Sequence, residues 1–161
     1  NVLGLDMGMF YKRRDYTRIV DGRNPIIAHE FLGTSVEGKD MIIIDDMISS
    51  GDSVLEVAAE LKNRRAHKIF VFSTFGLFTS GLDKFDRAYE EGIIDRVLTT
   101  NLIYQTPELL RREWYINCDM SKYIAYIIDT LNHDSSISDL LNPNERITSI
   151  VARYKSGELS P

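Results

Sequence analysis

The segment 42–53 most constrains what this chain can fold into, because it runs from an apolar stretch through two acids and a polar loop into a helix. A short and uniformly apolar run such as residues 41–44 is typical of a central parallel strand that is covered on both faces. Residues 53–65 carry apolar side chains at helical spacing and predict the helix that follows. A strand joined to a helix in this way predicts the first unit of a parallel α/β sheet.

Short apolar runs and helix-period segments alternate along the rest of the chain. Further strands are predicted at residues 2–10, 68–74, 96–100 and 114–118. Further helices are predicted at residues 83–91 and 121–133, and the tail after Asn142 is predicted to form a short helix followed by disorder. The alternation predicts an α/β fold in which helices flank one parallel sheet with right-handed crossovers, within a single domain over residues 1–161.

Residues 11–39 show no sustained periodicity and are predicted to form a long loop, which in a compact domain is usually functional. This loop begins with a basic segment, although the net charge of the 161-residue chain is −5. The overall charge argues against nucleic acid or an anionic membrane as a partner, whereas the basic segment favours a small anionic substrate.

Three kinds of site are not predicted. Cys118 is the only cysteine, so an internal disulfide is excluded, and a reducing cytosol is compatible with the sequence. No two of the three histidines have the spacing of metal ligands, and we therefore predict no metal site. No apolar run is long enough to span a bilayer, so no membrane segment is expected.

The loop at residues 49–53 has the composition of a phosphate-binding turn. Gly51 permits a positive φ or the close approach of a ligand, and the hydroxyls of Ser49, Ser50 and Ser53 can donate hydrogen bonds. The helix that starts near Ser53 presents unpaired N–H groups and the positive end of its dipole. The sequence therefore favours a phosphate at this turn, although a Ser-rich turn that simply caps the helix is the alternative.

Asp45 and Asp46 precede this loop at the predicted carboxyl end of a parallel strand, where ligands of α/β proteins bind. Their carboxylates can accept hydrogen bonds from two neighbouring hydroxyls, such as those of a ribose. Together with the phosphate loop, they predict a site for a sugar phosphate.

An apolar strand, two aspartates, two further residues and a Ser-Gly loop that closes on a hydroxyl residue resemble the phosphoribosyl diphosphate motif of the type I phosphoribosyltransferase fold. The segment Tyr-Lys-Arg-Arg at residues 11–14 resembles the start of the catalytic flexible loop of ribose-phosphate diphosphokinases, which make phosphoribosyl diphosphate. Further segments that resemble this family extend the resemblance over nearly the whole chain, and they lie at residues 20–25, 28–33, 74–78, 100–104 and 119–123. The chain, which starts at Asn1, is therefore interpreted as the C-terminal half of such an enzyme, without the ATP-binding N-terminal half.

The resemblance implies a transfer of diphosphate from ATP to ribose 5-phosphate, which gives AMP and phosphoribosyl diphosphate for nucleotide biosynthesis. It implies a cytoplasmic homo-oligomer and a requirement for Mg²⁺, whose ligands are expected mainly outside this chain. Lys12 matches the catalytic lysine, Arg14 matches a loop arginine, and Asp45 matches a ribose-binding acid with Asp46 beside it. The expected phosphate loop consists of Ser49, Ser50, Gly51, Asp52 and Ser53.

Typical family members have Asp-Thr-Gly/Ala-Gly-Thr in the phosphate loop, so Asp52 is a departure. An acid beside a phosphate is repelled by it, and we expect the Asp52 side chain to point away. Two alternatives remain open: a phosphoribosyltransferase that joins a base to phosphoribosyl diphosphate, and a non-catalytic regulatory subunit of the synthetase. The chain by itself is expected to bind the sugar phosphate without turnover.

Overall fold

The structure is a computed structural model that describes the backbone of residues 3–14 and 26–158, and their side chains except at 12–14, 26–30, 139 and 141. The chain divides into two compact units. The larger unit is Met7–Met120, and the smaller one consists of Asn1–Asp6 and Ser121–Pro161. The expectation of one domain over residues 1–161 stays a prediction beside this division.

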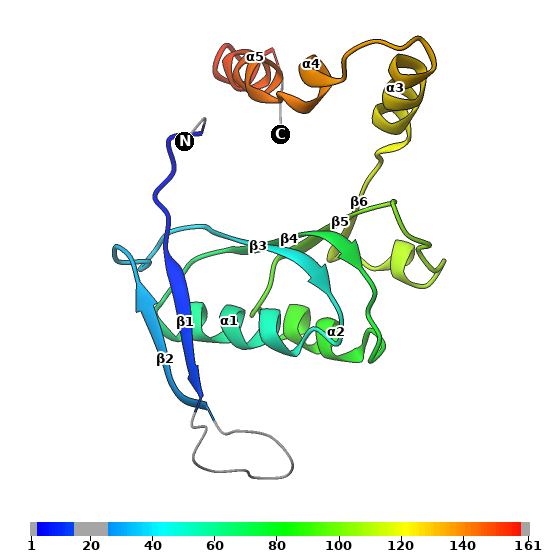
Figure 1. The fold of residues 1–161 in the computed structure, drawn as a ribbon. Coiled ribbons are helices and arrows are strands. Elements are labelled where there is room, and N and C mark those ends of the chain that lie inside the picture. Colours follow the sequence, from blue (N-terminus) through cyan, green and yellow to red (C-terminus); the bar gives the residue numbers. More distant parts are fainter. Residues whose placement is uncertain (1–2, 15–25, 159–161) are drawn as a thin grey trace. The chain divides into compact units, whose positions relative to one another are not determined.

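A parallel four-stranded sheet forms the larger unit (Figure 1). The strands follow one another in the order β3 (Met41–Ile48), β4 (Ile69–Gly76), β5 (Arg96–Thr100) and β6 (Tyr115–Cys118). The helices α1 (Asp52–Asn63) and α2 (Asp83–Glu90) lie on the same face of this sheet, and the 3-10 turn η1 (Leu109–Arg111) precedes β6. The predicted parallel α/β sheet flanked by helices is confirmed.

The core lies between the two helices and this face of the sheet. Helix α1 contributes Val54, Ala58 and Leu61, and the sheet contributes Ile69 and Val71. Aromatic side chains fill the part of the core near α2, and they belong to Phe78, Phe85, Trp114 and Tyr115. Along α1 and β4, the buried residues are separated by more exposed ones, as expected for a helix and a strand that bury one face.

The position of β3 corrects two predictions from the sequence. It is an edge strand, and its side chains at Ile42 and Ile44 are 46% and 82% exposed, so the predicted coverage of both faces is wrong. Both helices of the larger unit cover the opposite face of the sheet (Figure 1). The strand also continues to Ile48, because Met47 and Ile48 still pair with β4. Asp45 therefore lies within the strand and not after its end.

A β-hairpin replaces much of the loop that was predicted at residues 11–39. Strands β1 (Met9–Arg14) and β2 (Ile26–Leu32) pair antiparallel and form a second sheet. Phe10 and Phe31 face each other across the pair, with ring centroids 5.0 Å apart. The prediction of a continuous loop was therefore wrong at these strands. Residues 15–25 lie outside the described part of the chain.

The smaller unit is helical. Helix α3 (Ser121–Asn132) confirms the helix predicted at 121–133, and α4 (Ser138–Leu141) and α5 (Asn144–Lys155) follow it. Helix α5 has 12 residues and confirms a helix in the tail, and it begins directly after Pro143, a residue that suits a helix start. The predicted disorder beyond it falls partly on residues 159–161, outside the described residues. Among the helices described here, none combines the length and apolar character needed to cross a bilayer.

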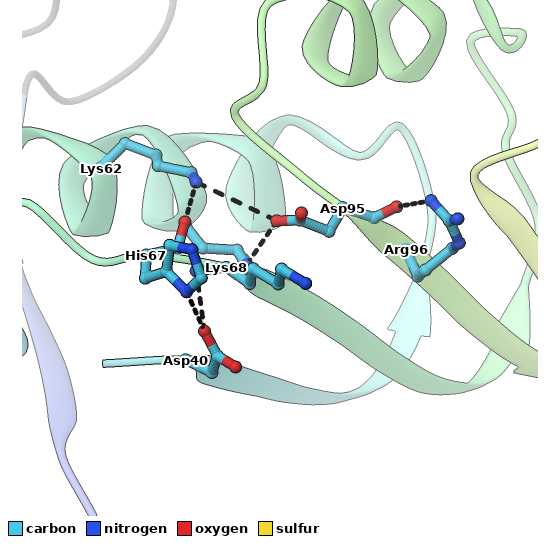
Figure 2. A network of polar contacts seen from close by, with 7 residues as sticks. Asp40, Lys62, His67, Lys68, Asp95 and Arg96 are labelled. Atoms are coloured by element: carbon cyan, nitrogen blue, oxygen red, sulfur yellow. Dashed lines mark hydrogen bonds and ion pairs between the residues drawn. The ribbon is translucent and has the colours of Figure 1, made fainter. Parts of the chain in front are cut away.

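Polar contacts fix the amino ends of the parallel strands (Figure 2). The carboxylate of Asp40, just before β3, contacts Nδ1 of His67 at 2.7 Å and accepts a hydrogen bond from the backbone N–H of Lys68 at 3.2 Å. The carboxylate of Asp95, just before β5, accepts one from the N–H of Ile69 at 2.8 Å. The amino ends of the strands are thus occupied by structural contacts. The loops of the candidate site follow the carboxyl ends of the strands.

Candidate functional site

The loop between β3 and α1 encloses a cavity of about 120 Å³. The cavity is lined by Asp45, Met47, Ile48, Ser49, Ser50, Gly51, Ser53 and Val54. The structure therefore brings most of the predicted substrate-binding residues together around one space. The residues lining this cavity do not include Asp46 and Asp52, which were also predicted to bind substrate.

Gly51 gives the loop its shape. It is the N-cap residue of α1 and has φ 84° and ψ −7°, in the left-handed region that favours glycine. Its carbonyl accepts the hydrogen bond from the N–H of Leu55 at 3.0 Å, so the helix starts directly from the loop. Gly51 has no side chain to cap this helix end, and the N–H of Asp52, the first residue of α1, donates a long hydrogen bond of 3.5 Å to Oγ of Ser50. The first N–H groups of an α-helix have no partner within the helix itself. Such an end attracts an anion.

The ring of Phe85, from α2, lies directly beneath Gly51. A Cβ atom added at Gly51 would meet Cε2 of this ring and come within 2.5 Å of its Cζ atom. Phe85 is fully buried and stacks on Trp114 at a centroid distance of 5.4 Å. The loop therefore rests on the aromatic core, and only glycine fits between the two.

The two neighbouring acids have different positions. Successive side chains of a strand point to opposite faces, so Asp45 and Asp46 cannot act on the same ligand from the same side. Asp45 is half-buried and lines the cavity, whereas Asp46 is exposed. The N–H of Asp46 donates a hydrogen bond of 2.9 Å to Oδ1 of Asp45, which holds that carboxylate in place. Of the two predicted sugar-binding acids, only Asp45 lies at the cavity.

The carboxylate of Asp52 is turned toward two other side chains. Ser50 Oγ donates a hydrogen bond of 2.9 Å to Oδ2 of Asp52, and Lys84 Nζ lies 2.5 Å from Oδ1. Lys84 belongs to α2 and is 32 residues away in the sequence, so no local pattern pointed to it.

The segment between β4 and α2 supports the start of the loop. The N–H of Leu77 donates to the carbonyl of Ile48 at 2.8 Å, and the N–H of Thr79 donates to the carbonyl of Ser49 at 3.0 Å. The hydroxyls of Ser49 and Thr79 are 3.4 Å apart. Thr79 could not be predicted from local sequence patterns, because its partner lies 30 residues away.

Two titratable groups of β6 have raised pKa values. Burial raises the pKa of the Cys118 thiol, so the reactive thiolate is disfavoured. Burial also raises the pKa of Tyr115, whose hydroxyl is 2.7 Å from Oγ1 of Thr99 in the core. Tyr115 is therefore a packing and hydrogen-bonding residue of the core.

Lys12 and Arg14, the predicted catalytic residues, lie on β1 and pair with His29 and Ile26 of β2. Their side chains are outside the description, so their roles stay predictions. Across the described residues, no cluster of three or more His, Cys, Asp or Glu side chains could hold a metal ion.

Comparison with known proteins decides the family. Residues 21–142 match the family model described as phosphoribosyl synthetase-associated domain. The chain belongs to this family. The resemblance to ribose-phosphate diphosphokinases, seen first in the sequence motifs, is thereby confirmed.

Several curated members of the wider family are similar to the chain. It is 30% identical to the ribose-phosphate pyrophosphokinase of Shewanella oneidensis over 137 residues. This aligned region is 85% of the chain and 40% of that enzyme. The enzyme of the same name from Vibrio cholerae is 27% identical over 138 residues, or 86% of the chain and 41% of the enzyme. The chain thus spans about two fifths of the length of these relatives.

Two further relatives extend the comparison. The human phosphoribosyl pyrophosphate synthase-associated protein 2 is 37% identical over 105 residues, or 65% of the chain and 28% of that protein. The crystal structure of phosphoribosylpyrophosphate synthetase from Mycobacterium smegmatis matches with a TM-score of 0.58 and 21% identity, over 67% of the chain and 35% of that structure. This structural likeness confirms the predicted phosphoribosyltransferase-like fold.

Proposed function

We propose that this chain is the sugar-phosphate-binding part of a ribose-phosphate diphosphokinase, which transfers diphosphate from ATP to ribose 5-phosphate. The observation that carries this proposal is the cavity at the start of α1, where Asp45 and the hydroxyls of the Gly51 loop surround one space. A phosphate placed at the loop would accept hydrogen bonds from serine hydroxyls and backbone N–H groups. The ribose hydroxyls would then donate to the carboxylate of Asp45.

Lys12 and Arg14 are proposed to act on the diphosphate in transfer. Such a transfer spreads negative charge over the equatorial oxygens, and positioned cations stabilise that charge. The described residues do not fit a Mg²⁺ site, because they offer no group of three suitable ligands, and we assign no step of the reaction to a metal in this chain. ATP binding, assembly into a homo-oligomer and a cytoplasmic location are proposals that rest on the resemblance.

We expect the chain to bind ribose 5-phosphate, and we expect Asp45→Asn to weaken that binding about tenfold, because a charged acceptor is replaced by a neutral one. Isothermal titration calorimetry with ribose 5-phosphate measures both affinities. Asp46→Asn is the matched control, since it makes the same change one residue along on the opposite face of β3. Its affinity should stay within about twofold of the unchanged chain. A larger loss with Asp46→Asn than with Asp45→Asn would contradict this placement of the sugar.

The chain by itself should release no AMP above background from ATP and ribose 5-phosphate, because the proposed ATP-binding part is expected elsewhere in the enzyme. A coupled assay of AMP release, with an intact ribose-phosphate pyrophosphokinase as the positive control, measures this. Turnover by the chain near that of the intact enzyme would contradict the proposal that ATP is bound by another part of the enzyme.

A regulatory subunit is the second candidate, and the 37% identity to a human synthase-associated protein favours it. A subunit of this kind would bind an active synthetase and need no turnover of its own. Pull-down with a separate synthetase chain tests this reading. If the chain captures that synthetase and does not itself bind ribose 5-phosphate, the regulatory function is favoured over the catalytic one.

A further inference from the structure

An acid at the edge of a phosphate site needs a compensating charge. Asp52 is the first residue of α1 and directly follows Gly51 in the loop. A carboxylate there is favourable for the helix, because it interacts with the positive end of the dipole. The same charge repels a bound phosphate, and the repulsion between two charges a few ångströms apart is significant even near a protein surface.

Lys84 supplies this compensating charge. Its ammonium group lies 2.5 Å from Oδ1 of Asp52, while the other carboxylate oxygen accepts the hydrogen bond of the Ser50 hydroxyl. Asp52 therefore connects a cation on α2 to a hydroxyl that lines the cavity. The side chains of Lys84 and Asp52 are 38% and 51% exposed, and a pair so accessible to water contributes little to the free energy of unfolding. Its effect should therefore appear in ligand binding and not in stability.

Lys84 does not line the cavity of the loop. It lines a separate cavity of about 240 Å³ between α1 and α2, together with Leu55, Arg87, Ala88, Glu91 and Ile93. An effect of Lys84 on a phosphate in the loop must therefore pass through Asp52 or act through space.

The position of Lys84 is fixed by the same turn of α2 that supports the loop. Phe85, the next residue, is fully buried beneath Gly51. One turn of α2 therefore contacts the loop at two consecutive residues, with the ring of Phe85 under Gly51 and the ammonium group of Lys84 at Asp52.

We infer that Lys84 is a positioning residue of the phosphate site, which acts through Asp52 by neutralising its charge and by keeping it hydrogen-bonded to Ser50. The inference rests on the function proposed above for this loop. It adds a residue from α2 to a site that the sequence motif confines to the segment between β3 and α1.

The test is a double-mutant cycle, with affinity for ribose 5-phosphate measured by calorimetry. Lys84→Met should weaken binding about fivefold to tenfold, because the Lys84 charge that offsets the repulsion between Asp52 and the phosphate is then lost. Lys84→Arg should restore binding to within about twofold, since it keeps the charge. With Asp52→Asn present, Lys84→Met should change the affinity less than about twofold, because there is no charge left to neutralise. Arg87→Met is the matched control, with the same loss of charge one turn further along α2, and it should bind normally.

The outcomes separate this inference from the proposed function. No binding of ribose 5-phosphate by the unchanged chain would contradict the proposed function and, with it, this inference. Normal binding by the unchanged chain and by Lys84→Met would contradict the inference alone. Lys84→Met could also reduce the affinity equally in the unchanged chain and in the Asp52→Asn variant. That result would overturn the inference, because Lys84 would then act on the phosphate directly through space.

Discussion

Gly51→Ala is expected to lower the free energy of unfolding of the larger unit by about 2–5 kcal/mol. Two costs add up in this variant. Alanine is strained at φ 84°, and its methyl group would lie within 2.5 Å of Cζ of Phe85. The ring cannot move aside, because it is fully buried and packs against Phe78 and Trp114. Urea denaturation followed by the fluorescence of the single tryptophan measures the change.

Gly81→Ala separates the two costs. Gly81 has φ 79°, close to that of Gly51, but a Cβ atom there would meet nothing within 4 Å. It should therefore show only the backbone strain, about 1–2 kcal/mol. Equal losses in the two variants would mean that Phe85 yields to the methyl group, and the tight contact between loop and core would be refuted. The Gly51 variant should also bind ribose 5-phosphate more weakly, whereas Gly81→Ala should not.

Trp114→Ala is expected to lower the free energy of unfolding by about 3–5 kcal/mol. The indole is 1% exposed and contacts the rings of Phe78, Phe85 and Tyr115. Its Nε1 donates a hydrogen bond of 2.7 Å to Asp86 of α2, so the substitution leaves a cavity and a carboxylate without this donor. Far-UV circular dichroism in urea gives the measurement, since the fluorescent residue is removed.

Two further variants make this prediction specific. Tyr104→Ala removes an aromatic side chain that is 81% exposed and should change the free energy of unfolding by less than about 0.5 kcal/mol. Trp114→Phe keeps an aromatic ring in the core but loses the hydrogen bond to Asp86, and it should cost less than Trp114→Ala. A Trp114→Ala variant as stable as Tyr104→Ala would contradict the described core.

Local patterns in the sequence were sufficient to predict most strands of the parallel sheet. The apolar runs at β4, β5 and β6 and the helical spacing in α1 and α3 depend on residues close together in the chain, and the structure has these elements nearly where they were expected. The loop at Gly51 could also be predicted, because a glycine between a strand and a helix has few other uses. These features need no knowledge of distant contacts.

Features that depend on distant partners could not be predicted. The strands β1 and β2 are stabilised by their pairing with each other, in which Phe10 meets Phe31, and neither strand has a clear alternating pattern of its own. The order of strands made β3 an edge strand, and a uniformly apolar run does not reveal strand order. The different placement of Asp45 and Asp46 followed from the extension of β3 to Ile48, which pairing with β4 determines.

The contact between Gly51 and Phe85 restricts how this site can change in evolution. A larger residue at position 51 would clash with the ring of Phe85, and a smaller residue at position 85 would leave a cavity under the turn. Each substitution is tolerated best when the other accompanies it, so the two positions should vary as a pair among natural homologues. The proposed phosphate loop is then inherited together with Phe85, a buried residue that lies outside the motif.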